Sequence, residues 1–194
     1  VIGDPSTEGV RMGSLVGQTQ REDVRAQIAI LQEESEIVFG SPEVVDVRGA
    51  DSEKGAFMSP ILMRVTNVDA ATKVHEVEAF GPVSTMMPYS TVAEAVELSK
   101  KGRGSLCCSI ATHDPEVAKE FVRNAASMHG RILVLDRESA KESTGHGSPL
   151  PLLVHGGPGR AGGGEEMGGL RGIRHYMQRT AIQGHPSMLT AITE

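Results

Sequence analysis

Residues 105–135 read SLCCSIATHDPEVAKEFVRNAASMHGRILVL, and this stretch decides the fold. The apolar run at 105–111 predicts a strand, and Asp114 with Pro115 supplies a helix cap and a first-turn proline. Apolar residues then recur at helical spacing before a second apolar run at 131–135. A strand, a helix and a strand at this spacing indicate parallel strands joined by a right-handed crossover.

The same alternation continues toward the N-terminus. Residues 83–89 are strand-like, and Thr91 and Glu94 have capping-box spacing ahead of a helix that runs toward Gly102. The predicted strands and helices form one series, so we expect these strands to share one sheet. The predicted fold class is α/β, a parallel twisted sheet with flanking helices.

The N-terminal part carries a helix and two short strands. Thr19 and Glu22 have the spacing of a capping box, so we expect a helix over residues 20–33. The apolar runs at 37–39 and 61–65 read as strands, and the polar residues between them read as a loop.

The C-terminal part is rich in glycine. Between Gly145 and Gly172 lie 11 of the 23 glycines, and a loop of this length in a compact domain is often functional. Residues 157–162 match the dinucleotide fingerprint G-x-G-x-x-G. No clear strand precedes them and no helix opens after them, so we do not expect a pyrophosphate loop. Residues 179–183 read as a last strand.

Composition argues against several functions. The 194 residues carry a net charge of −6, aromatic residues make up 3% and tryptophan is absent, so we expect no nucleic-acid partner. No stretch has the roughly 18 apolar residues of a membrane span, and no signal pattern opens the chain. We therefore expect a cytoplasmic protein with no membrane partner. The seven histidines show no paired ligand spacing, so we expect no metal site.

The two cysteines, Cys107 and Cys108, are adjacent within the predicted strand at 105–111. A thiolate is a strong nucleophile where a base or a helix N-terminus lowers its pKa. The middle of an apolar strand instead favours buried, inert thiols. We accordingly expect no catalytic residue in this chain.

Residues 78–82, Glu-Ala-Phe-Gly-Pro, are the stretch most suggestive of a binding site. Alternation along an extended segment places Glu78 and Phe80 on one side. There a carboxylate can accept hydrogen bonds from two sugar hydroxyls while the aromatic ring covers a flat heterocycle. By itself the stretch is equally consistent with a turn at the end of a strand.

In chain order, several segments resemble the aldehyde dehydrogenase superfamily over nearly the whole length. Residues 3–5 and 12–15 resemble the family's GDP and MGPL segment, and residues 78–82 resemble its E-x-F-G-P motif. Residues 104–110 resemble its G-L-A-A-x-V strand, and residues 130–134 resemble its G-x-v-x-v segment. Glu78 to Pro82 is the most specific of these matches.

The glycine-rich tail narrows the resemblance. Residues 149–166 and 179–184 are similar to the phenylacetate-degradation bifunctional proteins of the PaaZ type, in which an aldehyde dehydrogenase half precedes a MaoC-like hydratase half. Family members carry an asparagine after the G-x-v-x-v strand, whereas this chain has Leu135 and Asp136. We therefore expect the aldehyde end of the pocket to be non-standard.

The resemblance implies the C-terminal portion of an NAD(P)-dependent aldehyde dehydrogenase. Residues 1–176 would be the catalytic lobe without its nucleophile segment, and residues 177–194 an oligomerisation strand and tail. In the family, the nucleophilic cysteine, the glutamate base and the Rossmann half lie upstream of Gly3, so we expect this fragment to be inactive alone. The implied reaction oxidises an aldehyde to the acid through a cysteine thiohemiacetal. The tail suggests a CoA-linked semialdehyde of aromatic degradation.

The resemblance also assigns site residues. The implied cofactor is NADP or NAD, with Glu78 holding the nicotinamide ribose, Phe80 packing against the ring and Gln20 as a further contact. Residues 136–164 would shape the mouth of the aldehyde tunnel, and the last strand would leave its own lobe to build a homo-oligomer. The alternative class, a non-catalytic α/β module that binds a ligand or partner, stays open, because a chain without its nucleophile cannot perform this reaction alone.

Overall fold

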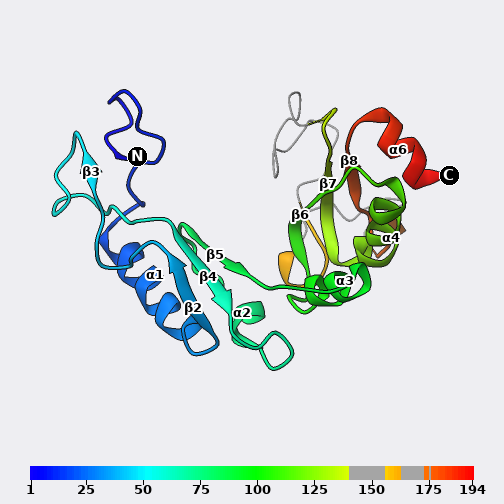
Figure 1. Ribbon diagram of the computed structural model, residues 1–194, viewed down its shortest axis with the longest axis horizontal. Helices are drawn as coiled ribbons and strands as arrows, with labels where there is room; N and C mark the ends of the chain where they lie inside the picture. Colours follow the sequence, from blue (N-terminus) through cyan, green and yellow to red (C-terminus); the bar gives the residue numbers. More distant parts are fainter. Residues whose placement is uncertain (140–155, 163–172, 175) are drawn as a thin grey trace. The chain divides into compact units, whose positions relative to one another are not determined.

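The computed structural model describes residues 1–139, 156–162, 173–174 and 176–194 (Figure 1). The chain divides into two compact units, Val1–Pro88 and Tyr89–Glu194, and each has a hydrophobic core of its own. The predicted α/β class is confirmed in both units, which combine mostly parallel strands with flanking helices.

Unit 1 combines one long helix with short strands. Its elements are β1 (Ile2–Gly3), α1 (Gln18–Leu31), β2 (Ser35–Phe39), β3 (Val47–Arg48), β4 (Ile61–Val65), α2 (Lys73–Glu76) and β5 (Val83–Met86). Strands β2, β4 and β5 form a sheet in that order, with β2 antiparallel and β5 parallel to β4. Val24, Ile28 and Leu31 recur one turn apart on α1 and are buried in the same cluster as Ile61 and Met63 of β4.

Two details of unit 1 differ from expectation. Helix α1 begins at Gln18 after Gly17, so Thr19 lies inside the helix, where its hydroxyl cannot act as the N-cap. In addition, β5 pairs with β4 and not with the later strands, so the expected single sheet is wrong. The apolar pattern of a strand does not specify its partner, because main-chain hydrogen bonding is the same along any available edge.

Unit 2 contains the strand, helix and strand predicted over residues 105–135. Its elements are α3 (Val92–Lys100), β6 (Ser105–Ala111), α4 (Pro115–Ala125), the 3₁₀ turn η1 (Ala126–Met128), β7 (His129–Leu135), the 3₁₀ turn η2 (Gly159–Ala161), β8 (Ala181–Gln183) and α6 (Pro186–Thr193). Strands β6, β7 and β8 form a fully parallel sheet in that order. The predicted strand–helix–strand unit is therefore confirmed.

Both predicted helix caps in unit 2 are present. The Thr91 hydroxyl accepts from the Glu94 amide at 3.1 Å, and the Glu94 carboxylate accepts from the Ser90 amide at 2.7 Å. The Asp114 carboxylate accepts from the Glu116 amide at 2.9 Å, with Pro115 in the first turn. These caps lie within a few residues of the helices that they start, which is why the sequence alone predicts them.

The last strand lies within unit 2. Strand β8 begins two residues later than expected and pairs with β7 of the same chain, Ile182 opposite Ile132. This corrects the expectation that it leaves its own lobe, and pairing with a neighbouring subunit stays a prediction. The residues after it form α6, whose Met188 and Ile192 are buried in the unit 2 core.

The glycine-rich residues 156–162 use their amides within the fold. The Gly157 amide donates to the Gly162 carbonyl at 2.8 Å, and the Arg160 amide donates to the Arg103 carbonyl at 3.1 Å. A β-carbon on Gly157 would lie 2.4 Å from the Ser105 carbonyl oxygen. The segment is thus packed on the start of β6, in agreement with the expectation that it is not a pyrophosphate loop.

His129, the first residue of β7, is a buried polar side chain in unit 2. Its Nδ1 lies 2.7 Å from Ser105 Oγ on β6, and its Nε2 lies 3.3 Å from Ser99 Oγ on α3. The ring stacks on Phe121 of α4 with centroids 6.4 Å apart. Burial lowers the pKa of His129 below its usual 6.5, because the imidazolium would lose its solvation.

We expect the protein to lose stability as the pH falls below 6.5. The unfolded chain binds a proton at His129 more readily than the folded chain, so this contribution is present above 6.5 and disappears as the pH falls through the folded pKa. The slope is at most about 1.4 kcal/mol per pH unit. His129→Gln, which does not titrate, should flatten the dependence of Tm on pH between about pH 7 and pH 5, followed by circular dichroism. Equal slopes in the two proteins would contradict this role.

Candidate functional site

The candidate site is the segment 77–82 of unit 1, between α2 and β5. Val77 and Ala79 pack against the unit 1 core, whereas Glu78 and Phe80 are exposed. The ring-bearing side chain of Phe80 is 72% exposed, which is unusual for a phenylalanine. The predicted alternation therefore holds for burial, and it brings a carboxylate and an aromatic ring to solvent two residues apart.

The backbone at Phe80 departs from the extended segment that the alternation argument assumed. Its φ is 51°, in the left-handed region that non-glycine residues seldom adopt. Such a conformation persists only where the surrounding structure imposes it, and it is common in binding sites. The chain is therefore turned sharply at Phe80 before it enters β5.

Helix α1 contacts this turn at two points. The Gln20 side-chain amide, in the first turn of α1, donates from Nε2 to the Phe80 carbonyl at 2.6 Å. One turn later, both γ-methyl groups of Val24 lie 2.7 Å from where a β-carbon on Gly81 would stand, so only glycine fits there. The Pro82 carbonyl then accepts from the Ile61 amide at 2.8 Å, at the start of the β4–β5 ladder.

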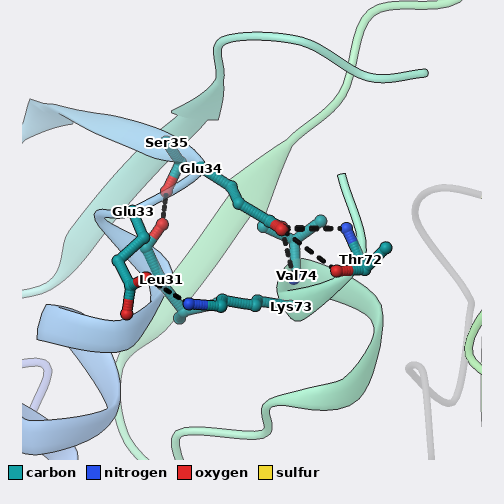
Figure 2. Close-up of polar contacts among 7 residues, drawn as sticks. All are labelled: Leu31, Glu33, Glu34, Ser35, Thr72, Lys73 and Val74. Carbon is teal, nitrogen blue, oxygen red and sulfur yellow. Dashed lines mark hydrogen bonds and ion pairs between the residues drawn. The ribbon is translucent and has the colours of Figure 1, made fainter. Parts of the chain in front are cut away.

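The other end of the segment is anchored through α2 (Figure 2). Glu34, just after α1, reaches the first turn of α2, where its carboxylate accepts from the Thr72 amide at 2.9 Å, the Thr72 hydroxyl at 3.1 Å and the Val74 amide at 3.3 Å. Lys73 pairs with Glu33 beside it. Thr72 precedes α2 without capping it through its own side chain, so Glu34 performs that function from a distant part of the sequence.

These contacts change the acidity of Glu34. Partial burial alone would raise its pKa, but the hydrogen bonds from Thr72, Val74 and Lys73 together outweigh it and hold the pKa below the usual 4.5. The anchor is thus a charged carboxylate at neutral pH.

The two cysteines of unit 2 lie next to each other on strand β6. Burial, with a further contribution from neighbouring Cys107, raises the pKa of the Cys108 thiol to about 11. Cys107 is half-buried in the same strand, β6. A thiol with a raised pKa carries little thiolate at neutral pH, so Cys108 is a poor nucleophile in this fold.

Two kinds of feature are absent from the described residues. Across the described ranges, no three histidine, cysteine, aspartate or glutamate side chains come together in a way that would hold a metal ion. In that same part of the chain, none of the helices combines the length and the apolar character needed to cross a membrane.

Glu78 and Phe80 present a carboxylate and an aromatic ring to solvent. A carboxylate can accept hydrogen bonds from hydroxyls and an exposed aromatic face can stack on a flat ring, while Gly81 beside them packs on Val24. Residues 1–182 also match the profile of the aldehyde dehydrogenase family. The chain belongs to this family. The resemblance stated from the sequence motifs is confirmed.

Relatives within the family cover most of the chain. Protein MaoC of Klebsiella aerogenes is 50% identical over 182 residues, which are 93% of this chain and 52% of that protein. The 3,4-dehydroadipyl-CoA semialdehyde dehydrogenase of Aromatoleum evansii is 40% identical over 157 residues, 81% of this chain and 30% of that enzyme. The chain thus spans about half the length of the first relative and less of the second.

The solved structure of aldehyde dehydrogenase C from Pseudomonas syringae, a mutant complexed with NAD+ and octanal, has the same fold. It superposes with a TM-score of 0.64 at 25% identity, covering 84% of this chain and 30% of that one. The fold of this chain is therefore similar to that of a solved aldehyde dehydrogenase, in agreement with the family match.

The structure brings some of the predicted residues together and adds neighbours that the sequence analysis did not include. Gln20 and Phe80 are brought together by a hydrogen bond, and Glu78 lies two residues from Phe80. Glu34 and Val24 were missed, because nothing in their local sequence marks a contact with residues about 40 or more positions away. Of the predicted tunnel mouth, residues 140–155, 163 and 164 lie outside the described residues.

We expect Glu34→Gln to destabilise the protein by about 1 kcal/mol at neutral pH, after allowance for solvent screening. Because the folded pKa of Glu34 is lowered, its stabilising effect is present above pH 4.5 and is lost as the pH falls through the folded pKa. The gap in Tm between the wild type and the variant should therefore close in acid. Glu36→Gln, an exposed carboxylate on β2, is the control. A gap that persists unchanged in acid would exclude a charge-dependent anchor.

Proposed function

We propose that these residues form the catalytic lobe of an NAD(P)-dependent aldehyde dehydrogenase, with Glu78 and Phe80 holding the nicotinamide half of the cofactor. The observation that carries this proposal is the exposed Phe80 ring, on a residue of positive φ whose carbonyl accepts from Gln20, next to the exposed Glu78 carboxylate. Backbone conformations of this kind cluster at binding sites, which supports a functional role for Phe80. Membership of the family supports the reaction class.

Each residue has a separate role in this proposal. Glu78 accepts hydrogen bonds from the ribose hydroxyls, Phe80 packs on the nicotinamide face, and Gln20 is the third cofactor-site residue. When bound, NAD or NADP supplies the hydride acceptor. Together the residues hold the acceptor in one orientation, which raises the rate by fixing the approach geometry.

We further propose that the aldehyde is a CoA-linked semialdehyde, which is oxidised to the acid. The relative from Aromatoleum evansii, at 40% identity, is named for such a substrate and supports this class. Attack on the aldehyde would be by a cysteine outside these residues, forming a thiohemiacetal, because the Cys108 pKa of about 11 disfavours a thiolate. The 194-residue chain alone would accordingly be inactive.

We expect Glu78→Gln in the whole enzyme to weaken NAD(P)+ binding or slow hydride transfer by about tenfold, because a neutral amide replaces a charge-assisted acceptor. Cofactor titration and single-turnover formation of NAD(P)H measure the two effects separately. Glu36→Gln is the matched control, since it removes an exposed carboxylate of the same unit away from the segment 77–82. Unchanged cofactor affinity and hydride transfer in Glu78→Gln would refute the assignment.

The C-terminal residues 177–194 are proposed to support a homo-oligomer through β8. This strand lies at one end of the order β6-β7-β8, and an edge strand offers backbone groups to a second copy. Light scattering at micromolar concentration should give a mass above 20.6 kDa. Ala181→Lys on β8 should lower that mass, because a charge on an edge strand opposes pairing. A monomer mass for the wild-type chain, or a larger assembly that Ala181→Lys leaves intact with circular dichroism unchanged, would count against β8 as the interface.

A further inference from the structure

The contact between Gln20 and Phe80 crosses from a helix to an irregular segment 60 residues away in the sequence. Gln20 lies in the first turn of α1 and is half-buried, whereas the Phe80 ring is exposed. The donor is the side-chain amide and the acceptor is the main-chain carbonyl, at 2.6 Å. The bond therefore acts on the direction of the backbone at Phe80 without covering its ring.

The backbone conformation of Phe80 is intrinsically unfavourable for a non-glycine residue. A φ of 51° is disfavoured for a side chain with a β-carbon by about tenfold relative to the right-handed regions. A single neutral hydrogen bond favours one state by about threefold to tenfold. The Gln20 bond and the packing of Gly81 on Val24 are thus of the size needed to hold the turn.

We infer that Gln20 is a positioning residue that sets the direction of the Phe80 ring by holding the Phe80 carbonyl. The inference rests on the proposed function, in which that ring meets the nicotinamide. It adds that the ring is preorganised before the cofactor arrives, through the chain's own α1. Gln20 then influences cofactor binding through its hydrogen bond to the Phe80 carbonyl, in addition to any direct contact with the cofactor.

The side-chain requirement is specific. The residue at position 20 must carry a hydrogen-bond donor at the end of an unbranched stem long enough to reach from α1 to the carbonyl. Lysine keeps both properties, and methionine keeps the length without the donor. Both are good helix formers, so neither substitution weakens α1 through its helix propensity.

A cofactor-free reporter tests the inference directly. The chain contains no tryptophan, so Phe80→Trp introduces a sole indole at the site. In the full 194-residue chain, Gln20→Met added to this reporter should lower its fluorescence anisotropy and broaden its lifetime distribution, whereas Gln20→Lys should leave both near the Gln20 values. Thr19→Ala, an exposed neighbour in the same turn, is the matched control and should change neither.

The outcomes separate the inference from the proposed function. Equal anisotropy for Gln20→Met and the parent reporter, with circular dichroism showing both folded, overturns the positioning role whatever the cofactor does. If Gln20→Met does not fold, Gln20→Ala takes its place with the same expectation. In the whole enzyme with Phe80 intact, Gln20→Met should raise the Kd for NAD(P)+ by about threefold to tenfold, and Gln20→Lys by less. A lowered anisotropy, with cofactor affinity and hydride transfer both unchanged in Gln20→Met and Glu78→Gln, would leave the positioning of Phe80 standing and refute the cofactor site.

Discussion

Val24 is fully buried on α1, and its two γ-methyl groups occupy the space that a side chain at position 81 would need. This close approach of a helix to a bare stretch of backbone is the constraint on which the candidate site depends. It brings the segment 77–82 against α1, within reach of Gln20, and thereby determines where the Phe80 backbone turns. A larger residue at position 81 would have to displace either the helix or the start of β5, since a packed core has no spare volume.

Helix α1 holds its surroundings at both ends. In its first turn, the Gln18 side-chain amide donates to the Lys54 carbonyl at 3.3 Å, and the Arg21 guanidinium donates to the Gly55 carbonyl at 3.3 Å. The Gln20 side-chain amide donates to the Phe80 carbonyl. Past its last turn, Glu34 caps α2. Gly17, the N-cap residue of α1, has no side chain that could cap the helix. The side chains of the first turn instead donate hydrogen bonds to the carbonyls of nearby loops. One helix, buried along a single face, thus contacts several loops that have little regular structure of their own.

Unit 2 obtains its order differently, through local caps and through glycines at close backbone contacts. A β-carbon on Gly130 would lie 1.7 Å from the Gly156 carbonyl oxygen, and one on Gly104 would lie 2.0 Å from the Pro158 carbonyl oxygen. The glycine-rich segment therefore packs main chain on main chain at the start of the sheet. A phosphate would need free backbone amides, but the Gly157 and Arg160 amides already donate to protein carbonyls. The match to the phosphate-binding fingerprint therefore reflects close packing of the main chain and not a phosphate site.

The sequence by itself determined the elements whose causes are local. The strands at 61–65 and 105–111, the helix over Pro115–Ala125 and the caps at Thr91 and Asp114 follow from apolar spacing and from hydrogen bonds that span only a few residues. The motif at residues 78–82 indicated the family and the exposed pair, since alternation in burial is also a local property. Only the tertiary structure decided that β5 joins β4, that β8 joins β7 in its own chain, that Phe80 turns to a positive φ, and that Glu34 caps α2. Each of these depends on groups far apart in the sequence meeting in space, and no local pattern specifies which edge, carbonyl or helix start a distant residue will reach.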